Sequence, residues 1–283
     1  MFSFRSRPVC HVIVGLAAFL SCTGLAAAYD VDTEVRAAPA PFTVPAPNQN
    51  AVLDCRFDMK VQGPPQNGRS IDLQDVEARY TFIAEADGRI SARVESPDLV
   101  HLARLKPGGG LDGVPMEEDG TPLTGRQLNL SLAAWDSISP EGFYGREINA
   151  GTMLELARHR ALVDQILDAF WSEPAGAALL DHIGTPVLQR MVRGLIEVDG
   201  RELVIVRTVH EREDVLRKGG QVDSFYGVVV IDDGYELETG LPMLQVEQGQ
   251  IYAKATRDGE AKHGLVAYHT TRIHCAPSGP ARE

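Results

Sequence analysis

Three histidines near the carboxyl terminus, His263, His269 and His274, are of the residue type best suited to bind a metal ion. In an extended strand, His263 and His269 point to the same face, but six residues at about 3.3 Å each separate them by roughly 20 Å. Two bonds to one ion span only about 4 Å. His274 points to the other face. We therefore expect no metal site on this strand and no bound cofactor.

Nucleophilic catalysis has no local motif either. The chain has no Gly-x-Ser-x-Gly sequence, and the carboxylates that follow His210, starting at Glu211, lack the second histidine of a zinc-protease helix. Catalytic groups often come from distant segments, so a hydrolase assembled from such segments stays open as an alternative. Its candidate general bases are His269 and His210.

The amino-terminal 28 residues have the order of a secretory signal peptide. Arg5 and Arg7 precede an uncharged apolar stretch over residues 9–25, and three alanines ending at Ala28 follow it. Cleavage after Ala28 predicts a periplasmic protein with no transmembrane span. A lipid anchor on Cys22 and an uncleaved membrane anchor are the less favoured alternatives.

Two cysteines, Cys55 and Cys275, remain after this cleavage. Apolar and polar residues alternate over 52–62, which places Cys55 on the apolar face, and the alternation over 265–275 turns Cys275 inward in the same way. In an oxidising compartment such a pair predicts a disulfide. The first and last strands would then be neighbours, with two buried free thiols as the alternative.

The composition argues against a nucleic-acid partner. The cleaved chain has 25 basic and 39 acidic side chains, a net charge of −14. Phosphate binding needs a clustered basic face. The longest basic groups are short, Arg158-His159-Arg160 and Arg217-Lys218.

The rest of the chain reads as one domain. Residues 29–50 are rich in alanine and proline, which predicts a stiff tether. Residues 51–277 are long enough for a single core, and 278–283 form a disordered tail. Hairpin turns are expected at four glycine-containing sites: Ala86-Asp87-Gly88, Asp199-Gly200, Asp232-Asp233-Gly234 and Arg257-Asp258-Gly259.

The pattern changes to a helical period in the middle of the chain. A capping box begins at Thr152, and apolar residues follow at helical spacing as far as Phe170. A second helix is expected over about 176–183, and a third begins where Thr185 caps it. This predicts a central helical insertion over about residues 152–194.

These observations predict an α+β fold, mainly an antiparallel β-sheet in the form of a curved sheet or partial barrel, with the helical insertion covering one face. The leading function is non-enzymatic. We expect a cell-envelope protein that binds a partner protein, or an apolar ligand such as lipid, in a concavity between sheet and helices. The expected lining residues are Tyr80, Phe82, Phe170 and Trp171. A helical layer that only covers the sheet is the alternative.

Overall fold

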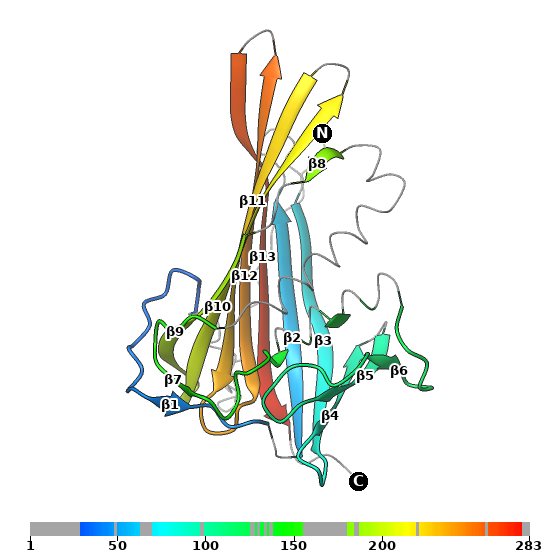
Figure 1. Ribbon diagram of the computed structural model, residues 1–283, viewed down its shortest axis with the longest axis vertical. Coiled ribbons are helices and arrows are strands. Elements are labelled where there is room, and N and C mark those ends of the chain that lie inside the picture. The colour runs from blue at the N-terminus through cyan, green and yellow to red at the C-terminus, as the bar shows by residue number, and fades with distance from the viewer. Residues whose placement is uncertain are drawn as a thin grey trace, which may run out of the picture.

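The computed structural model of the 283-residue chain describes residues 29–47, 50–62, 70–96, 99–124, 138–154, 180–183, 187–218, 221–257 and 260–278, with positions 128, 131, 132 and 135. Antiparallel β-strands make up nearly all regular structure in these ranges (Figure 1). The strands are β1 (Phe42–Thr43), β2 (Ala51–Gln62), β3 (Ser70–Ala84), β4 (Ile90–Ser96), β5 (Leu99–Leu105), β6 (Met116–Glu117), β7 (Glu147–Ile148), β8 (Leu180–Ile183), β9 (Val187–Val198), β10 (Arg201–Lys218), β11 (Gln221–Glu236), β12 (Pro242–Arg257) and β13 (Glu260–Ser278).

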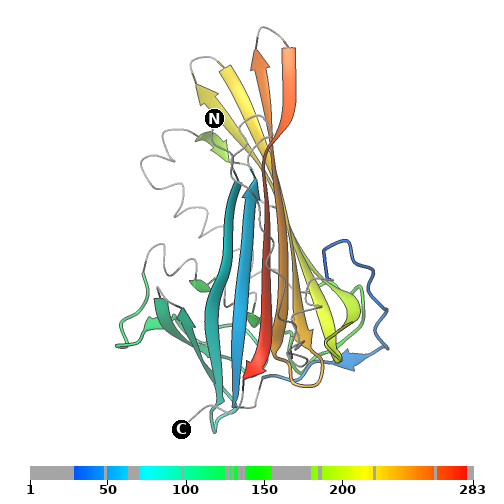
Figure 2. The same ribbon diagram turned by 180° about the vertical axis from the view of Figure 1, so that it is seen from behind.

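One large open sheet forms the body of the protein. Its strands run in the order β6-β5-β4-β3-β2-β13-β12-β11-β10-β8, and β9 also pairs with β10. Most neighbours are consecutive in sequence, as expected for strands joined by hairpins. The exceptions are β10 with β8 and the junction between β2 and β13, which run side by side in both views (Figures 1 and 2). The antiparallel sheet is thus as predicted, and it is curved but not closed.

Two predicted hairpin turns have the expected geometry. Ala84 pairs with Ile90, and Gly88 lies in the left-handed region at φ 83°. Val198 pairs with Arg201 across Asp199 and Gly200, which have φ values of 51° and 74°. Positive φ at both central residues is what a two-residue hairpin loop requires.

The turn predicted at Asp232-Asp233-Gly234 is wrong. These residues lie inside β11, where Asp233 pairs with Val206 of β10 and with Gln245 of β12. The real turn follows Glu236, with Gly240 at φ 71°. Asp-Gly is a turn signal only where the chain is free to reverse, and here partners on both sides keep it extended.

The Arg257-Asp258-Gly259 hairpin exists, but its register differs from the prediction by one residue. A three-residue loop over Arg257-Asp258-Gly259 would place Ala253 opposite His263. Instead, Arg257 pairs with Glu260 and Ala253 lies opposite Gly264. A register shift next to Tyr252 then moves Ile251 opposite Ala267. Such a bulge changes the pairing without moving the rest of the strand to the other face.

The predicted central helical insertion over 152–194 is not supported. Met153 forms a β-bridge with Met191, and residues 180–183 and 187–198 are the strands β8 and β9. Residues 155–179, with Phe170 and Trp171, lie outside the described part of the chain. The β-branched and apolar residues of β9 fit the pleated surface beside β10 better than a helix, because both neighbours contribute to packing there.

The amino-terminal segment 29–47, expected to be a tether, is extended but packs around the β9 edge of the sheet. Tyr29 is buried on one face, whereas Phe42 is buried with Tyr235 on the opposite face. Between them Arg36 forms a β-bridge with Leu195. A Cβ atom at Gly194 would approach the Arg36 carbonyl oxygen to 2.4 Å, so this crossing needs glycine. The segment thereby covers part of an edge strand.

Candidate functional site

A set of polar side chains shares one face of the long strands. Thr208, Ile231, Glu247 and Thr271 are opposite one another across β10 to β13. Directly opposite residues in antiparallel strands point to the same face. Four polar residues on this face, Arg190, Thr208, Asp233 and Thr271, are buried, which is unusual for their residue types. We call this set the polar strip; its members are Arg190, Thr208, Asp233, Gln245, Glu247, His269 and Thr271.

Arg190 of β9 begins the polar strip. It is 3% exposed, and its Nε donates a hydrogen bond to Thr208 Oγ1 at 2.9 Å. Burial lowers the pKa of the guanidinium, and the neighbouring Tyr235 and Asp233 oppose this. A buried cation is stable only where partners satisfy it, so Arg190 ties β9 to the polar interior.

Asp233 of β11 is the most unusual acid in the strip. It is 4% exposed, and burial raises the pKa of its carboxyl to about 7, against the lowering effects of Gln245 and Arg190. Gln245 Nε2 donates a hydrogen bond to Oδ1 at 2.7 Å. The second oxygen, Oδ2, has no hydrogen-bond partner among the residues that the structure describes. Burial of such an oxygen is costly without a donor.

Asp233 opens onto a small cavity of about 70 Å³ next to the disulfide. Its walls are mainly apolar: Tyr80, Ile138, Tyr235, Pro242, Leu244, Ile273 and Cys275, with Gln245 beside Asp233. Tyr80 therefore lines this cavity, whereas Phe82 is fully buried in the core. Trp135, from a stretch in which the described positions are helical, packs edge-on against Tyr80 with ring centroids 6.4 Å apart.

The disulfide lies at this same place. Cys55 and Cys275 are directly opposite each other in β2 and β13, and their sulfur atoms are 1.99 Å apart. Both side chains face inward, and their exposed fractions are 2% and 6%. As predicted, the strand that carries Cys55 therefore lies directly beside the last strand of the sheet.

His269 is positioned by two neighbours. Its Nε2 lies 2.6 Å from Glu247 Oε1, and its ring covers Gly249 of the adjacent strand. A Cβ at Gly249 would come within 1.8 Å of the imidazole Cε1, so glycine makes room for the ring. A carboxylate that orients an imidazole is one part of an acid–base site.

The two candidate bases, His269 and His210, fall in one row of the sheet. His210 pairs with Val229, Val229 with Gly249, and Gly249 with His269. Three strand spacings separate the two histidines by about 14 Å. They therefore share a face without forming one catalytic pair.

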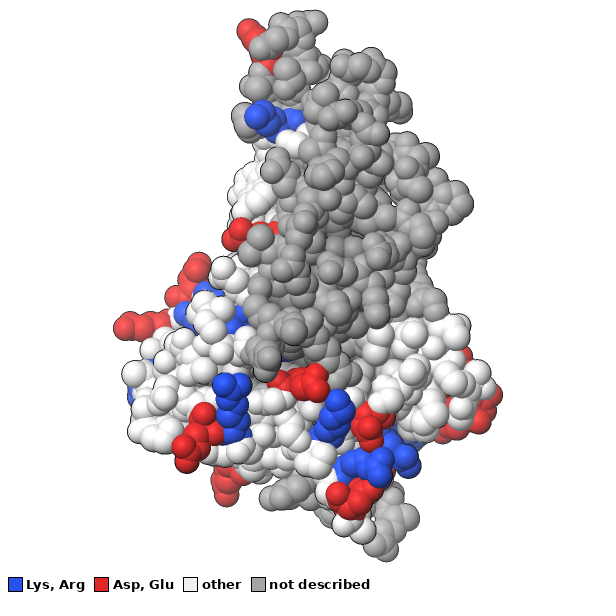
Figure 3. All heavy atoms as spheres, viewed as in Figure 1, with Lys and Arg blue, Asp and Glu red and all other residues white. Residues whose placement is uncertain are grey.

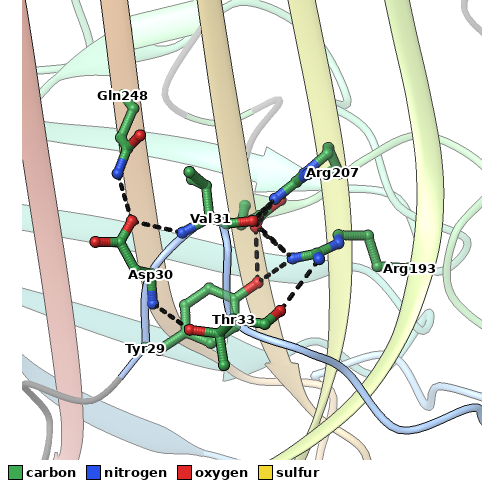
Figure 4. A network of polar contacts seen from close by, with 8 residues as sticks. Tyr29, Asp30, Val31, Thr33, Arg193, Arg207 and Gln248 are labelled. Atoms are coloured by element: carbon green, nitrogen blue, oxygen red, sulfur yellow. Dashed lines mark hydrogen bonds and ion pairs between the residues drawn. The ribbon is translucent and has the colours of Figure 1, made fainter.

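A second polar network, on the opposite face, attaches the amino-terminal segment (Figure 4). Tyr29 donates its hydroxyl hydrogen to Asp232 Oδ2 at 2.7 Å, and Arg207 Nε donates to Asp232 Oδ1 at 2.7 Å. Arg193 also donates to Asp232 and to the Thr33 carbonyl oxygen. Burial, with the adjacent Asp232, raises the pKa of Tyr29. These groups satisfy one another, which indicates a structural role.

Exposed apolar side chains gather where the strands extend beyond the core. Tyr226, Tyr252 and Leu265 are paired in register across β11, β12 and β13, and they are 41%, 40% and 41% exposed. We call these three residues the distal row. It lies toward the end of the sheet at which the β10–β11 and β12–β13 hairpins project in Figure 1. The sequence gives no local signal for this row, because Gln248, Gln250 and Lys254 share the face of Tyr252 in β12.

Charges on the face shown in Figure 3 are mixed. Basic and acidic side chains alternate over the lower part of this view, without a large patch of one sign. Exposed ion pairs are present among the described residues, such as Arg79 with Asp54 and Lys106 with Glu141. The described residues on this face therefore form no basic surface for a nucleic acid.

Within the described ranges, no group of three or more His, Cys, Asp or Glu residues is placed to hold a metal ion. No helix among the described residues is both long and apolar enough to cross a bilayer. No protein-family model matches the chain, and no curated protein matches it either.

Proposed function

We propose that this protein is an exported, non-enzymatic protein of the cell envelope that binds a partner protein through the distal row. The observation that carries this proposal is the in-register set of Tyr226, Tyr252 and Leu265, each about two-fifths exposed. Exposed apolar side chains that stand together mark interaction sites, whereas scattered ones do not.

The residue types favour a protein partner. Tyrosine is enriched at protein interfaces because its ring is apolar and its hydroxyl can form hydrogen bonds. The Tyr252 hydroxyl donates to Gln250 Oε1 at 2.6 Å, which holds the ring at the surface. Lys254, two residues along β12, is exposed and adds a polar rim.

A lipid-like ligand in an internal concavity has less support. Among the described residues, the cavity beside Asp233 measures about 70 Å³, and a second cavity beside Met243 and Cys275 measures about 200 Å³. Pockets for ordinary organic ligands measure roughly 300–1,000 Å³. A fatty acyl chain would need a much larger space, so the surface row is the better candidate for the principal binding site.

The proposed location rests on two features. The amino-terminal 28 residues have the pattern of a signal peptide. The disulfide between Cys55 and Cys275 is typical of proteins in an oxidising compartment. Together they support export to the periplasm.

Partner capture from an envelope extract of the source cell tests the binding surface. We expect the triple variant Tyr226→Ser, Tyr252→Ser, Leu265→Ser to retain at least ten-fold less of a specific bound protein than the unaltered chain, because removing a hot-spot group costs about 1.4 kcal/mol or more. The matched control is Ile83→Ser with Val114→Ser, whose side chains are 46% and 51% exposed elsewhere. Equal capture by all three proteins would exclude the distal row as the interface.

One observation favours a second candidate, an extracytoplasmic hydrolase with His269 as general base. Glu247 orients the imidazole at 2.6 Å. If the chain hydrolyses ester or amide substrates, His269→Ala should lower the rate by at least 100-fold, as is typical for loss of a general base. His274→Ala is the control, and an unchanged rate in His269→Ala would remove this mechanism.

A further inference from the structure

The cavity beside the disulfide combines an apolar wall with one incompletely bonded carboxyl group. Asp233 is held in place by the Gln245 amide at 2.7 Å, while its Oδ2 has no hydrogen-bond partner within the described ranges. The side chain lines the cavity, and the residue is 4% exposed. A buried oxygen of this kind is stabilised by any hydrogen-bond donor that enters the cavity.

We propose that this cavity binds a small primary ammonium compound, whose N–H group donates to Asp233 Oδ2 while its short alkyl chain packs against the apolar wall. This site is independent of the distal row. It differs from that surface in being small and built around one buried carboxyl group.

The wall is suited to an alkyl chain. Ile138, Leu244 and Ile273 contribute aliphatic surface, and Pro242 and Tyr235 complete one side. About 70 Å³ for the centres of water molecules corresponds to roughly five water positions, so the ligand has about four to six non-hydrogen atoms.

The surrounding charges favour a cation over a neutral donor. The charged groups that act on Asp233 are Arg190, Asp232 and Glu247, and both acids disfavour a second negative charge. Asp232 already binds Arg207 and Arg193 on the other face. Arg190 opposes these two acids, but burial outweighs its effect; a positive ligand would therefore further favour the ionised carboxyl, whereas a neutral alcohol would not.

Binding of n-butylammonium and of n-butanol to the purified chain, with its disulfide intact, tests this proposal. At pH 8 the Asp233 carboxyl is mostly ionised, since its pKa is about 7. Isothermal titration calorimetry should show n-butylammonium binding at least ten-fold more tightly than n-butanol, because the charge-assisted hydrogen bond is made only by the ammonium group. Equal affinity, or no binding of n-butylammonium up to about 100 mM, would overturn the proposal.

Asp233→Asn provides the matched variant. The asparagine keeps the size of the side chain and a carbonyl oxygen that can accept from Gln245, but it removes the charge. We expect it to bind n-butylammonium at least ten-fold more weakly and n-butanol about as well as the unaltered chain. Undiminished n-butylammonium binding would overturn the proposal. If the variant fails to fold, the comparison of the two compounds on the unaltered chain still decides.

Discussion

Replacing both Cys55 and Cys275 by alanine is expected to lower the free energy of unfolding by up to roughly 5 kcal/mol. The two cysteines are 220 residues apart in sequence. Their link joins β2 to β13, the one junction of the large sheet's described path that connects distant strands. Without the link, the unfolded chain gains much conformational freedom, and the first and last strands must find each other unaided. Urea unfolding followed by circular dichroism measures the difference.

The unaltered chain unfolded in the presence of a reducing agent is the control for this prediction. It should resemble the double alanine variant, since both lack the covalent link. A loss below about 1 kcal/mol in both cases would show that pairing of β2 with β13 is already stable without the disulfide.

Asp233→Asn is expected to change how stability depends on pH. The pKa of Asp233 is raised from 3.8 to about 7 in the folded chain. Between those values the folded chain keeps a proton that the unfolded chain releases, so the free energy of unfolding falls as the pH rises. A difference of about 3 pKa units corresponds to on the order of 4 kcal/mol. This contribution is fully present below about pH 4 and is lost as the pH rises through 7.

Unfolding free energies measured from pH 4 to pH 8 test this expectation. The unaltered chain should lose several kcal/mol more across this range than Asp233→Asn, because asparagine does not titrate. The groups around Asp233, which are Arg190, Asp232, Glu247, Tyr235 and Tyr144, are the same in both proteins. Parallel stability curves would show that Asp233 is not the source of the pH dependence.

Local signals predicted the hairpins that depend on backbone geometry alone. Gly88 and the Asp199-Gly200 pair lie at positive φ, and these turns form where the sequence places them. The inward alternation around Cys55 and Cys275 also led to the correct neighbouring strands. The turns depend on the steric limits of a few residues, which residue type alone reveals. The strand pairing depends on one buried face, which the alternation of apolar and polar residues reveals.

Features that depend on distant partners were not predictable in the same way. Asp232 and Asp233 look like a turn, but Arg207 and Arg193 bind the first and Gln245 binds the second. All three partners lie on other strands. A local turn signal cannot show that such partners are present, so strand β11 was divided wrongly.

Of the four residues expected to line a ligand site, two, Tyr80 and Phe82, lie in the described part of the chain, and only one of these lines a cavity. Tyr80 lines a cavity, whereas Phe82, two residues further along β3, is fully buried in the core. The distal row was missed because its members are far apart in the sequence and become neighbours only through the registers of β11, β12 and β13. Register across three strands is set by the whole sheet, so it is hard to derive from any single segment.

A photo-crosslinking amino acid at position 252, introduced into the protein in its own cell envelope, tests the proposed function most directly. Tyr252 is the central residue of the distal row and is 40% exposed. We expect one discrete crosslinked protein at position 252. This adduct should be absent when the same group replaces Ile83, and it should weaken when Tyr226 and Leu265 are changed to serine. No adduct at position 252, or the same adduct at both positions, would contradict binding of a partner through this row.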